Sequence, residues 1–115
     1  MSDTGEVDVF TALADPTRRA MLDLLTGGAR PAGDLVAAFP ALTQPAISRH
    51  LRVLREVGLV DVRAQAQRRI YTLRTEPLSE VDAWLGRYRD YWARHLDAIE
   101  AHLAAPPGQG AHDDR

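Results

Sequence analysis

The chain has 115 residues, of which 45% are hydrophobic and 26% charged, as expected for one globular domain with a single core. It contains no cysteine, which excludes disulfides, thiolate metal sites and a cysteine nucleophile. No apolar run approaches the roughly 18 residues of a membrane span, and the first six residues do not resemble a signal peptide. We therefore expect a cytoplasmic protein.

The net charge of −2 conceals an uneven distribution. Residues 43–74 hold seven arginines and two acidic residues, a net charge of +5, whereas the remainder has seven arginines and fourteen acidic residues, a net charge of −7. A basic segment in an acidic chain indicates a surface that binds a polyanion. A solvated arginine-rich face is the alternative, and the arrangement of the arginines has to decide between the two.

Three short helices are predicted in the first forty residues. Apolar residues recur at helical spacing between residues 7 and 13. Asp15 is a suitable N-cap and Pro16 a suitable first residue for a second helix, which the glycines at 27 and 28 end. A third short helix fits residues 31–39, and a turn of three residues follows it.

The next segment, residues 43–58, reads TQPAISRHLRVLREVG and predicts a helix with two different faces. Thr43 is a suitable N-cap, and Gly58 is a suitable stop. One face is an apolar stripe that would dock the helix, formed by Ile47, Leu51 and Leu54. The opposite face is polar and basic, with Gln44, Ser48, Arg49 and Arg52. A short helix at residues 31–39, a turn of three residues and this second helix with a basic outer face together predict a helix-turn-helix.

Strand periodicity replaces helical periodicity after Gly58. Residues 60–65 alternate between apolar and polar, and residues 70–73 form a second predicted strand with Tyr71 and Leu73 on its inner face. The hairpin is basic, because it carries Arg63, Arg68 and Arg69. A basic hairpin directly after a DNA-reading helix is the wing of a winged helix.

Residues 78–103 have the longest helical pattern in the chain. At 1.5 Å per residue this helix is roughly 39 Å long, more than a compact winged domain can cover. We expect its apolar stripe to pack against a second copy of the chain in a two-fold dimer, assisted by the first helix. The predicted interface consists of Phe10, Leu85, Tyr88, Trp92, Leu96 and Ile99. A core helix within one chain is the alternative.

These elements predict a mostly α-helical fold with a small β-hairpin, in the order of four helices, two strands and a terminal helix. Residues 7–103 would form a winged helix-turn-helix domain for DNA binding and homodimerisation. Residues 1–6 are expected to be disordered and residues 104–115 to form a flexible tail.

Two segments carry a resemblance to a known family. Residues 10–19, FTALADPTRR, and residues 43–60, TQPAISRHLRVLREVGLV, resemble the ArsR/SmtB family of bacterial transcriptional repressors, and the similarity extends over about residues 7–103. The resemblance implies a dimeric winged helix that binds an inverted-repeat operator in double-stranded DNA and releases it when an inducer binds. Repression, rather than activation, is carried over from the family.

The chain departs from the metal-sensing members of that family. Their third helix holds cysteines, and residues 30–35 here have none. Zinc-binding members use an Asp-x-His pair and a later His-x-x-Glu or His-x-x-His, whereas the last helix here has only His95 and His102. We therefore expect no metal and no cofactor, and a metal-sensing repressor with a site on the last helix stays open as an alternative. The wing also lacks the glycine that is frequent at its tip in the family.

The chemistry of the side chains predicts their roles at DNA. Arginine pairs bidentately with guanine and glutamine with adenine, which makes Arg49 and Gln44 the expected base readers. Ser48 would contact a base or a phosphate, while His50 would pack, contact phosphate or read a base. The remaining residues are expected at phosphates or in the minor groove: Thr43, Arg52, Arg63, Arg68 and Arg69.

Other classes of function have less support in the sequence. We expect no enzyme, because the chain has no glycine-rich phosphate loop, no paired acids at a plausible cleft and no Ser/His/Asp arrangement. A winged helix that contacts only other proteins is the remaining alternative. An inducer, if it is a small molecule, is not identified by the sequence, and the aromatic residues of the last helix would line a ligand pocket or belong to a core.

Overall fold

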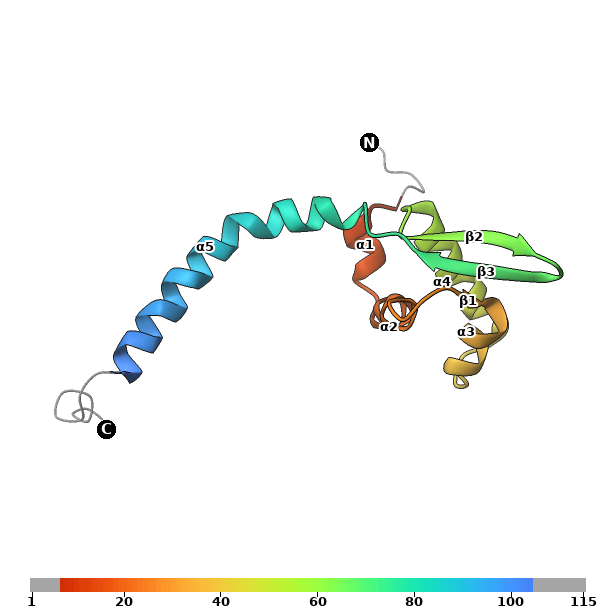
Figure 1. Cartoon of the computed structure of the whole chain (residues 1–115), viewed down its shortest axis with the longest axis horizontal. Coiled ribbons are helices and arrows are strands. Elements are labelled where there is room, and N and C mark those ends of the chain that lie inside the picture. The colour runs from red at the N-terminus through yellow and green to blue at the C-terminus, as the bar shows by residue number, and fades with distance from the viewer. Residues whose placement is uncertain (1–6, 105–115) are drawn as a thin grey trace. The chain divides into compact units, whose positions relative to one another are not determined.

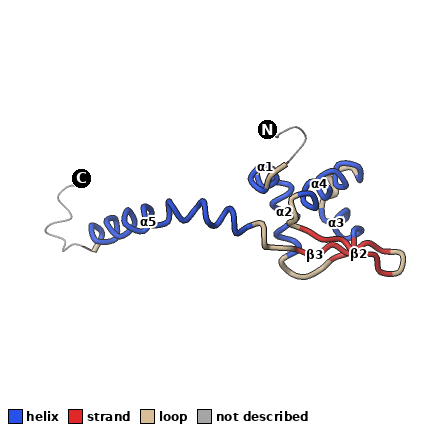
Figure 2. Tube along the Cα trace, turned by 90° about the horizontal axis from the view of Figure 1, so that it is seen from above, coloured by secondary structure: helices blue, strands red, loops and turns tan. Residues whose placement is uncertain are grey.

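The computed structural model describes residues 7–104 (Figures 1 and 2). Its elements are α1 (Val9–Leu13), α2 (Pro16–Leu25), β1 (Arg30–Pro31), α3 (Ala32–Ala38), α4 (Gln44–Glu56), β2 (Val60–Gln65), β3 (Arg68–Leu73) and α5 (Leu78–Leu103). The chain up to Val81 forms one compact unit, and α5 from Asp82 onward belongs to a second. The expectations for residues 1–6 and 105–115 lie outside the described residues. Within residues 7–104, no helix is long and apolar enough to cross a membrane.

The order of the elements confirms the predicted mostly helical fold with a small sheet. The hairpin of β2 and β3 pairs from Val60 with Leu73 to Gln65 with Arg68. A third strand was not predicted: β1 pairs antiparallel with β3, so that the strand order is β1-β3-β2. A strand of two residues is too short to show an alternating pattern in the sequence. Its Pro31, which has no N–H to donate, lies on an edge strand, as a proline in a sheet should.

The core of the first unit lies between the helices and the sheet. The predicted stripe of α4 is buried, and it packs with apolar residues of α2, α3, the strands and the position just before β2: Met21, Leu22, Leu25, Leu35, Leu59, Val60 and Tyr71. The expected inner face of β3 is confirmed, because Tyr71 belongs to the core and Leu73 is half-buried and packs against it. Ile70, next to Tyr71 on the strand, is buried as well. Successive strand residues point to opposite faces, so β3 is covered on both sides at this point.

Side-chain caps begin two of the helices where the sequence predicts them. The Asp15 carboxylate accepts the backbone N–H groups of Thr17 at 2.7 Å and Arg18 at 3.2 Å, and Pro16 follows as the first residue of α2. The hydroxyl oxygen of Thr43 accepts the N–H of Ala46 at 3.2 Å at the start of α4. Both caps satisfy N–H groups that a helix leaves without a partner in its first turn.

Replacing the Asp15 cap should lower the free energy of unfolding. Asp15→Ala removes the acceptor and should cost about 1 kcal/mol, whereas Asp15→Asn keeps an acceptor and should cost less. Burial acts to raise the pKa of Asp15, but the N–H groups of Arg18 and Thr17 and the charges of His50 and Arg18 outweigh it and lower this pKa below 3.8.

Because the pKa is lowered in the folded state, Asp15 contributes fully to the free energy of unfolding above pH 3.8. This contribution is lost as the pH falls through the folded-state pKa. Urea unfolding of the three proteins at neutral pH and in acid measures both effects. Equal stabilities of the wild type and Asp15→Ala at neutral pH would contradict the capping role.

Candidate nucleic-acid interface

The outer face of α4 is open to solvent. The apolar stripe docks one side of the helix, and all of the predicted contact residues of α4 except His50 are exposed: Gln44, Ser48, Arg49 and Arg52. Thr43 is exposed too, and although its oxygen accepts the Ala46 N–H, its own hydroxyl hydrogen stays available to a phosphate. The start of α4 therefore presents donors and a positive helix end on one surface.

His50 differs from these residues because it is half-buried and has a protein partner. Its Nδ1 atom lies 3.1 Å from Nη1 of Arg18, which belongs to α2. Arg18 was not among the predicted functional residues. No signal in a single sequence joins these two positions, because 32 residues separate them.

The wing carries the other predicted basic residues, and Arg63, Arg68 and Arg69 are all exposed. Its turn consists of Ala66 and Gln67. Ala66 has a φ of 56°, the left-handed region that favours glycine, and is the one described non-glycine residue with a positive φ. A two-residue hairpin turn with positive φ at its first position only is of type II′, in which glycine is the usual residue at that position.

One of the seven arginines in residues 43–74 is neutralised by acids. Arg74 forms ion pairs with Asp61 at 2.8 Å and Glu76 at 3.4 Å. The hydrogen bond and charge of Glu76, followed by those of Asp61, raise the pKa of Arg74, and the pKa of Glu76 is lowered by its own backbone N–H and by Arg74.

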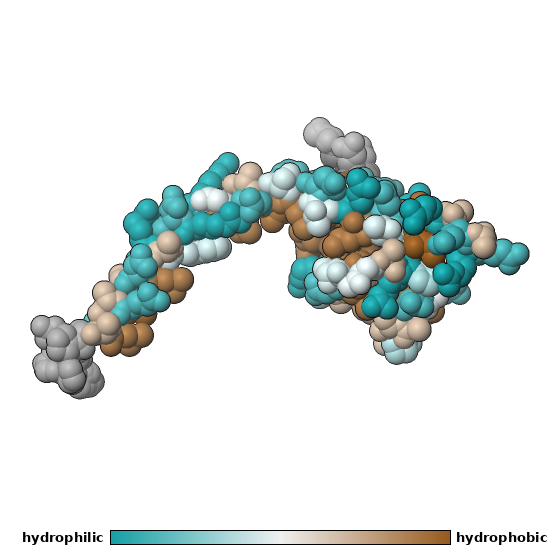
Figure 3. All heavy atoms as spheres, in the orientation of Figure 1, coloured by the Kyte–Doolittle hydropathy of each residue, from teal (hydrophilic) through white to brown (hydrophobic). Residues whose placement is uncertain are grey.

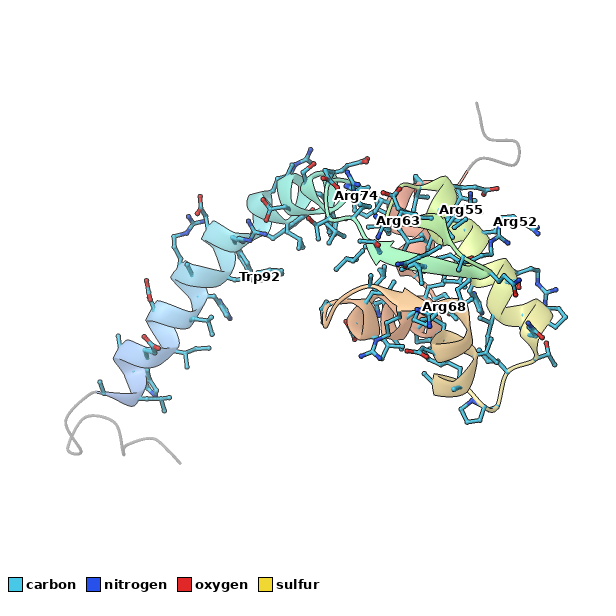
Figure 4. All side chains as sticks on the ribbon, turned by 45° about the vertical axis from the view of Figure 1, so that its right-hand side comes forward. Arg52, Arg55, Arg63, Arg68, Arg74 and Trp92 are labelled. Carbon is cyan, nitrogen blue, oxygen red and sulfur yellow. The ribbon has the colours of Figure 1, made fainter. Side chains whose placement is uncertain are left out.

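The other six arginines have no acidic partner within residues 7–104: Arg49, Arg52, Arg55, Arg63, Arg68 and Arg69. Figure 4 shows Arg52 and Arg55 on α4 and Arg63 and Arg68 on the hairpin. Unpaired arginines on one helix and one hairpin are available to an external anion.

A shallow, open pocket lies between the wing tip and the start of α3. Its charged and polar lining side chains are Asp34, Gln67, Arg68 and Arg69. Within residues 7–104 of a single chain, no group of three or more histidine or acidic residues is arranged to hold a metal ion. On α5, the ring of His95 stacks on that of Tyr91, with centroids 5.7 Å apart.

One side of α5 is apolar and exposed, and Figure 3 shows hydrophobic residues along one edge of this helix. No described residue of α5 is fully buried. Of the predicted interface residues, Leu85 is half-buried and the others are exposed: Phe10, Tyr88, Trp92, Leu96 and Ile99. Tyr88 contacts both Trp84, edge to face at 5.2 Å, and Trp92, at 6.4 Å between ring centroids.

The first unit has the parts of a winged helix-turn-helix DNA-binding domain: a short helix, a turn, a docked helix with a basic outer face, and a basic hairpin. A family model described as a helix-turn-helix domain matches residues 13–63, which include α2, α3 and α4 and the start of the wing. The match covers the elements that position the exposed arginines of α4.

Characterised relatives extend this similarity beyond the helix-turn-helix. The chain is 38% identical over 78 residues to the transcriptional repressor SdpR of Bacillus subtilis, an alignment that covers 68% of this chain and 86% of the relative. It is 34% identical over 91 residues to an arsenical resistance operon repressor of Staphylococcus xylosus, over 79% of this chain and 76% of the relative.

Solved structures of transcriptional regulators are also similar to this chain. An ArsR-like transcriptional regulator from Rhodococcus sp. RHA1 matches with a TM-score of 0.61 and 31% identity, over 84% of this chain and 89% of that one. A possible transcriptional regulator for arsenical resistance matches with a TM-score of 0.60 and 38% identity, over 83% and 94% of the two chains. The chain belongs to the ArsR/SmtB family of winged helix-turn-helix transcriptional regulators.

Replacing Ala66 by glycine should stabilise the wing. A left-handed conformation costs a non-glycine residue about 1–2 kcal/mol, and the higher chain entropy of glycine when unfolded offsets part of that gain. We expect Ala66→Gly to raise the free energy of unfolding by about 1 kcal/mol in urea titrations. Gln67→Gly is the matched control, because Gln67 has no positive φ and the change should destabilise. A destabilised Ala66→Gly would show that the turn is not under strain.

Proposed function

We propose that this protein is a repressor that binds an inverted-repeat operator in double-stranded DNA as a homodimer, through α4 and the wing. The observation that carries the proposal is the group of six arginines on α4 and the hairpin that have no acidic partner in the described residues. DNA phosphates are the partners that such a surface fits. As a DNA-binding protein it would act in the bacterial cytoplasm, at the nucleoid when bound.

The residues of α4 divide into base readers and phosphate contacts. Arg49 and Gln44 would read base edges in the major groove, since both are exposed at the N-terminal half of the helix. Ser48 would contact a base or a phosphate, and Thr43 and Arg52 would hold phosphates. On the wing, Arg63, Arg68 and Arg69 would hold the backbone or enter the minor groove.

A second copy of the chain is the proposed partner of the apolar side of α5. Tyr88, Trp92, Leu96 and Ile99 lie on one side of the helix and are exposed in the single chain. A two-fold pairing through this side, with Leu85 and with Phe10 of α1, would place two DNA-reading helices at half-sites about 34 Å apart. The two-fold symmetry of this pairing makes an inverted repeat the expected operator.

Other functions are supported less well by the same features. A winged helix that serves only as a protein-contact module does not need an unpaired basic face, and this one has it. An enzyme would need a nucleophile or paired acids in a cleft, and the pocket beside the wing presents one acid, Asp34, among arginines. The proposal therefore includes no catalysis, and no metal or cofactor. A small-molecule inducer stays unidentified.

Substitution of Arg49 should relax the sequence preference at one base pair of each half-site. Selection of duplexes from a random pool, followed by titration against competitor DNA, would first define the preferred site of the wild type. Arg49→Ala should lose about 1–3 kcal/mol of discrimination at one base pair of each half-site. Arg55→Ala is the matched control, since it removes an exposed arginine six residues further along α4. It should weaken binding to all sequences alike. Unchanged preference in Arg49→Ala would contradict the base-reading role.

A charge on the apolar side of α5 should break the dimer. Leu96→Glu would bury a carboxylate in the proposed interface and should yield monomers in sedimentation experiments. Ala101→Glu adds the same charge to the opposite side of the helix and should leave the dimer intact. A stable Leu96→Glu dimer that still binds DNA would place the interface elsewhere.

A further inference from the structure

Arg18 on α2 uses all three nitrogens of its guanidinium inside the protein. Nε donates to the carbonyl oxygen of Ala12 at 2.8 Å, and Nη2 donates to that of Thr11 at 3.2 Å. Nη1 lies 3.1 Å from Nδ1 of His50. Arg18 is half-buried, and this cation joins α1 to α4.

The bond from Arg18 determines which nitrogen of the His50 ring carries the hydrogen. A guanidinium has only donors and stays protonated in proteins, so Nδ1 of His50 must be the acceptor. The hydrogen of the neutral ring is then on Nε2, at the other side of the imidazole. The Arg18 bond thus makes His50 a donor in a defined direction.

Nε2 of His50 is available to a partner outside the protein. Among the side-chain polar atoms buried within residues 7–104, Nε of Arg30 is the one that has no hydrogen-bond partner. Nε2 of His50 has no partner in the described residues and is not among these buried atoms, so it reaches the surface. The carboxylate of Asp15 makes its hydrogen bonds to backbone N–H groups of α2 and not to His50. An acceptor for Nε2–H is therefore left to the ligand.

We propose that Arg18 is a positioning residue of the DNA-binding surface, which orients His50 so that its Nε2–H donates to a phosphate of the DNA backbone. This inference rests on the proposed DNA-binding function. A phosphate is favoured over a base because His50 is half-buried at the edge of the outer face, about 100° around the helix from the exposed Arg49. Contacts at such a flank fix the register of the helix in the groove and do not read sequence.

Two substitutions of His50 separate its two nitrogens. Asparagine offers an acceptor near the place of Nδ1 but is too short to replace Nε2, whereas glutamine can bring an N–H near the place of Nε2. His50→Asn should weaken binding about tenfold for each half-site, the loss of one hydrogen bond to a charged group in each subunit, and His50→Gln should keep most of the affinity. The fold-change in affinity should be the same for the selected site and for random DNA. Full affinity in His50→Asn overturns the phosphate contact.

A double-mutant cycle tests whether Arg18 acts through His50. Arg18→Met removes the donors at similar length, and the double variant with His50→Asn should bind no more weakly than His50→Asn alone. Additive losses overturn the positioning role. Arg18→Leu, which also removes every donor, replaces Arg18→Met in the cycle if thermal melting shows that the methionine variant does not fold.

Nitrogen-15 NMR of the histidine rings reads the tautomer without DNA. The His50 ring of the wild type should carry its hydrogen on Nε2 with Nδ1 unprotonated, and Arg18→Met should allow both tautomers. A hydrogen on Nδ1 in the wild type overturns the inference. If the wild type shows no competitor-resistant binding, the proposed function fails as well; wild-type binding with an unaffected His50→Asn overturns only the His50 contact.

Discussion

Burial of Ile47, Leu51 and Leu54 determines where α4 presents its arginines. At 3.6 residues per turn these three side chains fall within a narrow sector of the helix, and all three are buried. Each buried aliphatic side chain contributes about 1.5–3 kcal/mol, more than the 0–1 kcal/mol of a typical exposed ion pair. The core therefore sets the rotation of α4, and Arg49 and Arg52 point outward without acidic neighbours to hold them.

Local charge matters more than net charge for this surface. Screening in physiological salt limits interactions between exposed charges to roughly 8 Å, so acids elsewhere in the chain do little at α4. Acids that are close do matter: Asp61 and Glu76 pair with Arg74 and remove it from the set available to an anion. A protein with a net charge of −2 can in this way carry a strongly basic face. The pairing of Arg74 could not be counted from the sequence, because Asp61 lies thirteen residues away on the neighbouring strand.

The sequence predicted the features that depend on neighbouring residues. The caps at Asp15 and Thr43 and the stripe of α4 follow from local hydrogen bonding and helical spacing, and the outer face of α4 followed from the stripe. Strand β1, the positive φ of Ala66 and the bond between Arg18 and His50 were not predicted. Each of these depends on partners or on chain geometry that tertiary packing imposes. For Ala66 the sequence showed only that the wing lacks the glycine that is frequent at its tip in the family.

The apolar side of α5 connects assembly to DNA affinity. Most helical stability in proteins comes from packing of an apolar face, yet no described residue of this 26-residue helix is fully buried. Its opposite side holds Asp90, Arg94 and Asp97, all exposed, so the helix is two-sided and a partner is needed for the apolar side only. If that partner is a second copy, the second DNA-reading helix binds at a high effective concentration once the first is bound. The same exposed side chains would then form the dimer interface and, through it, raise the affinity for an operator, because both winged domains bind the same DNA at once.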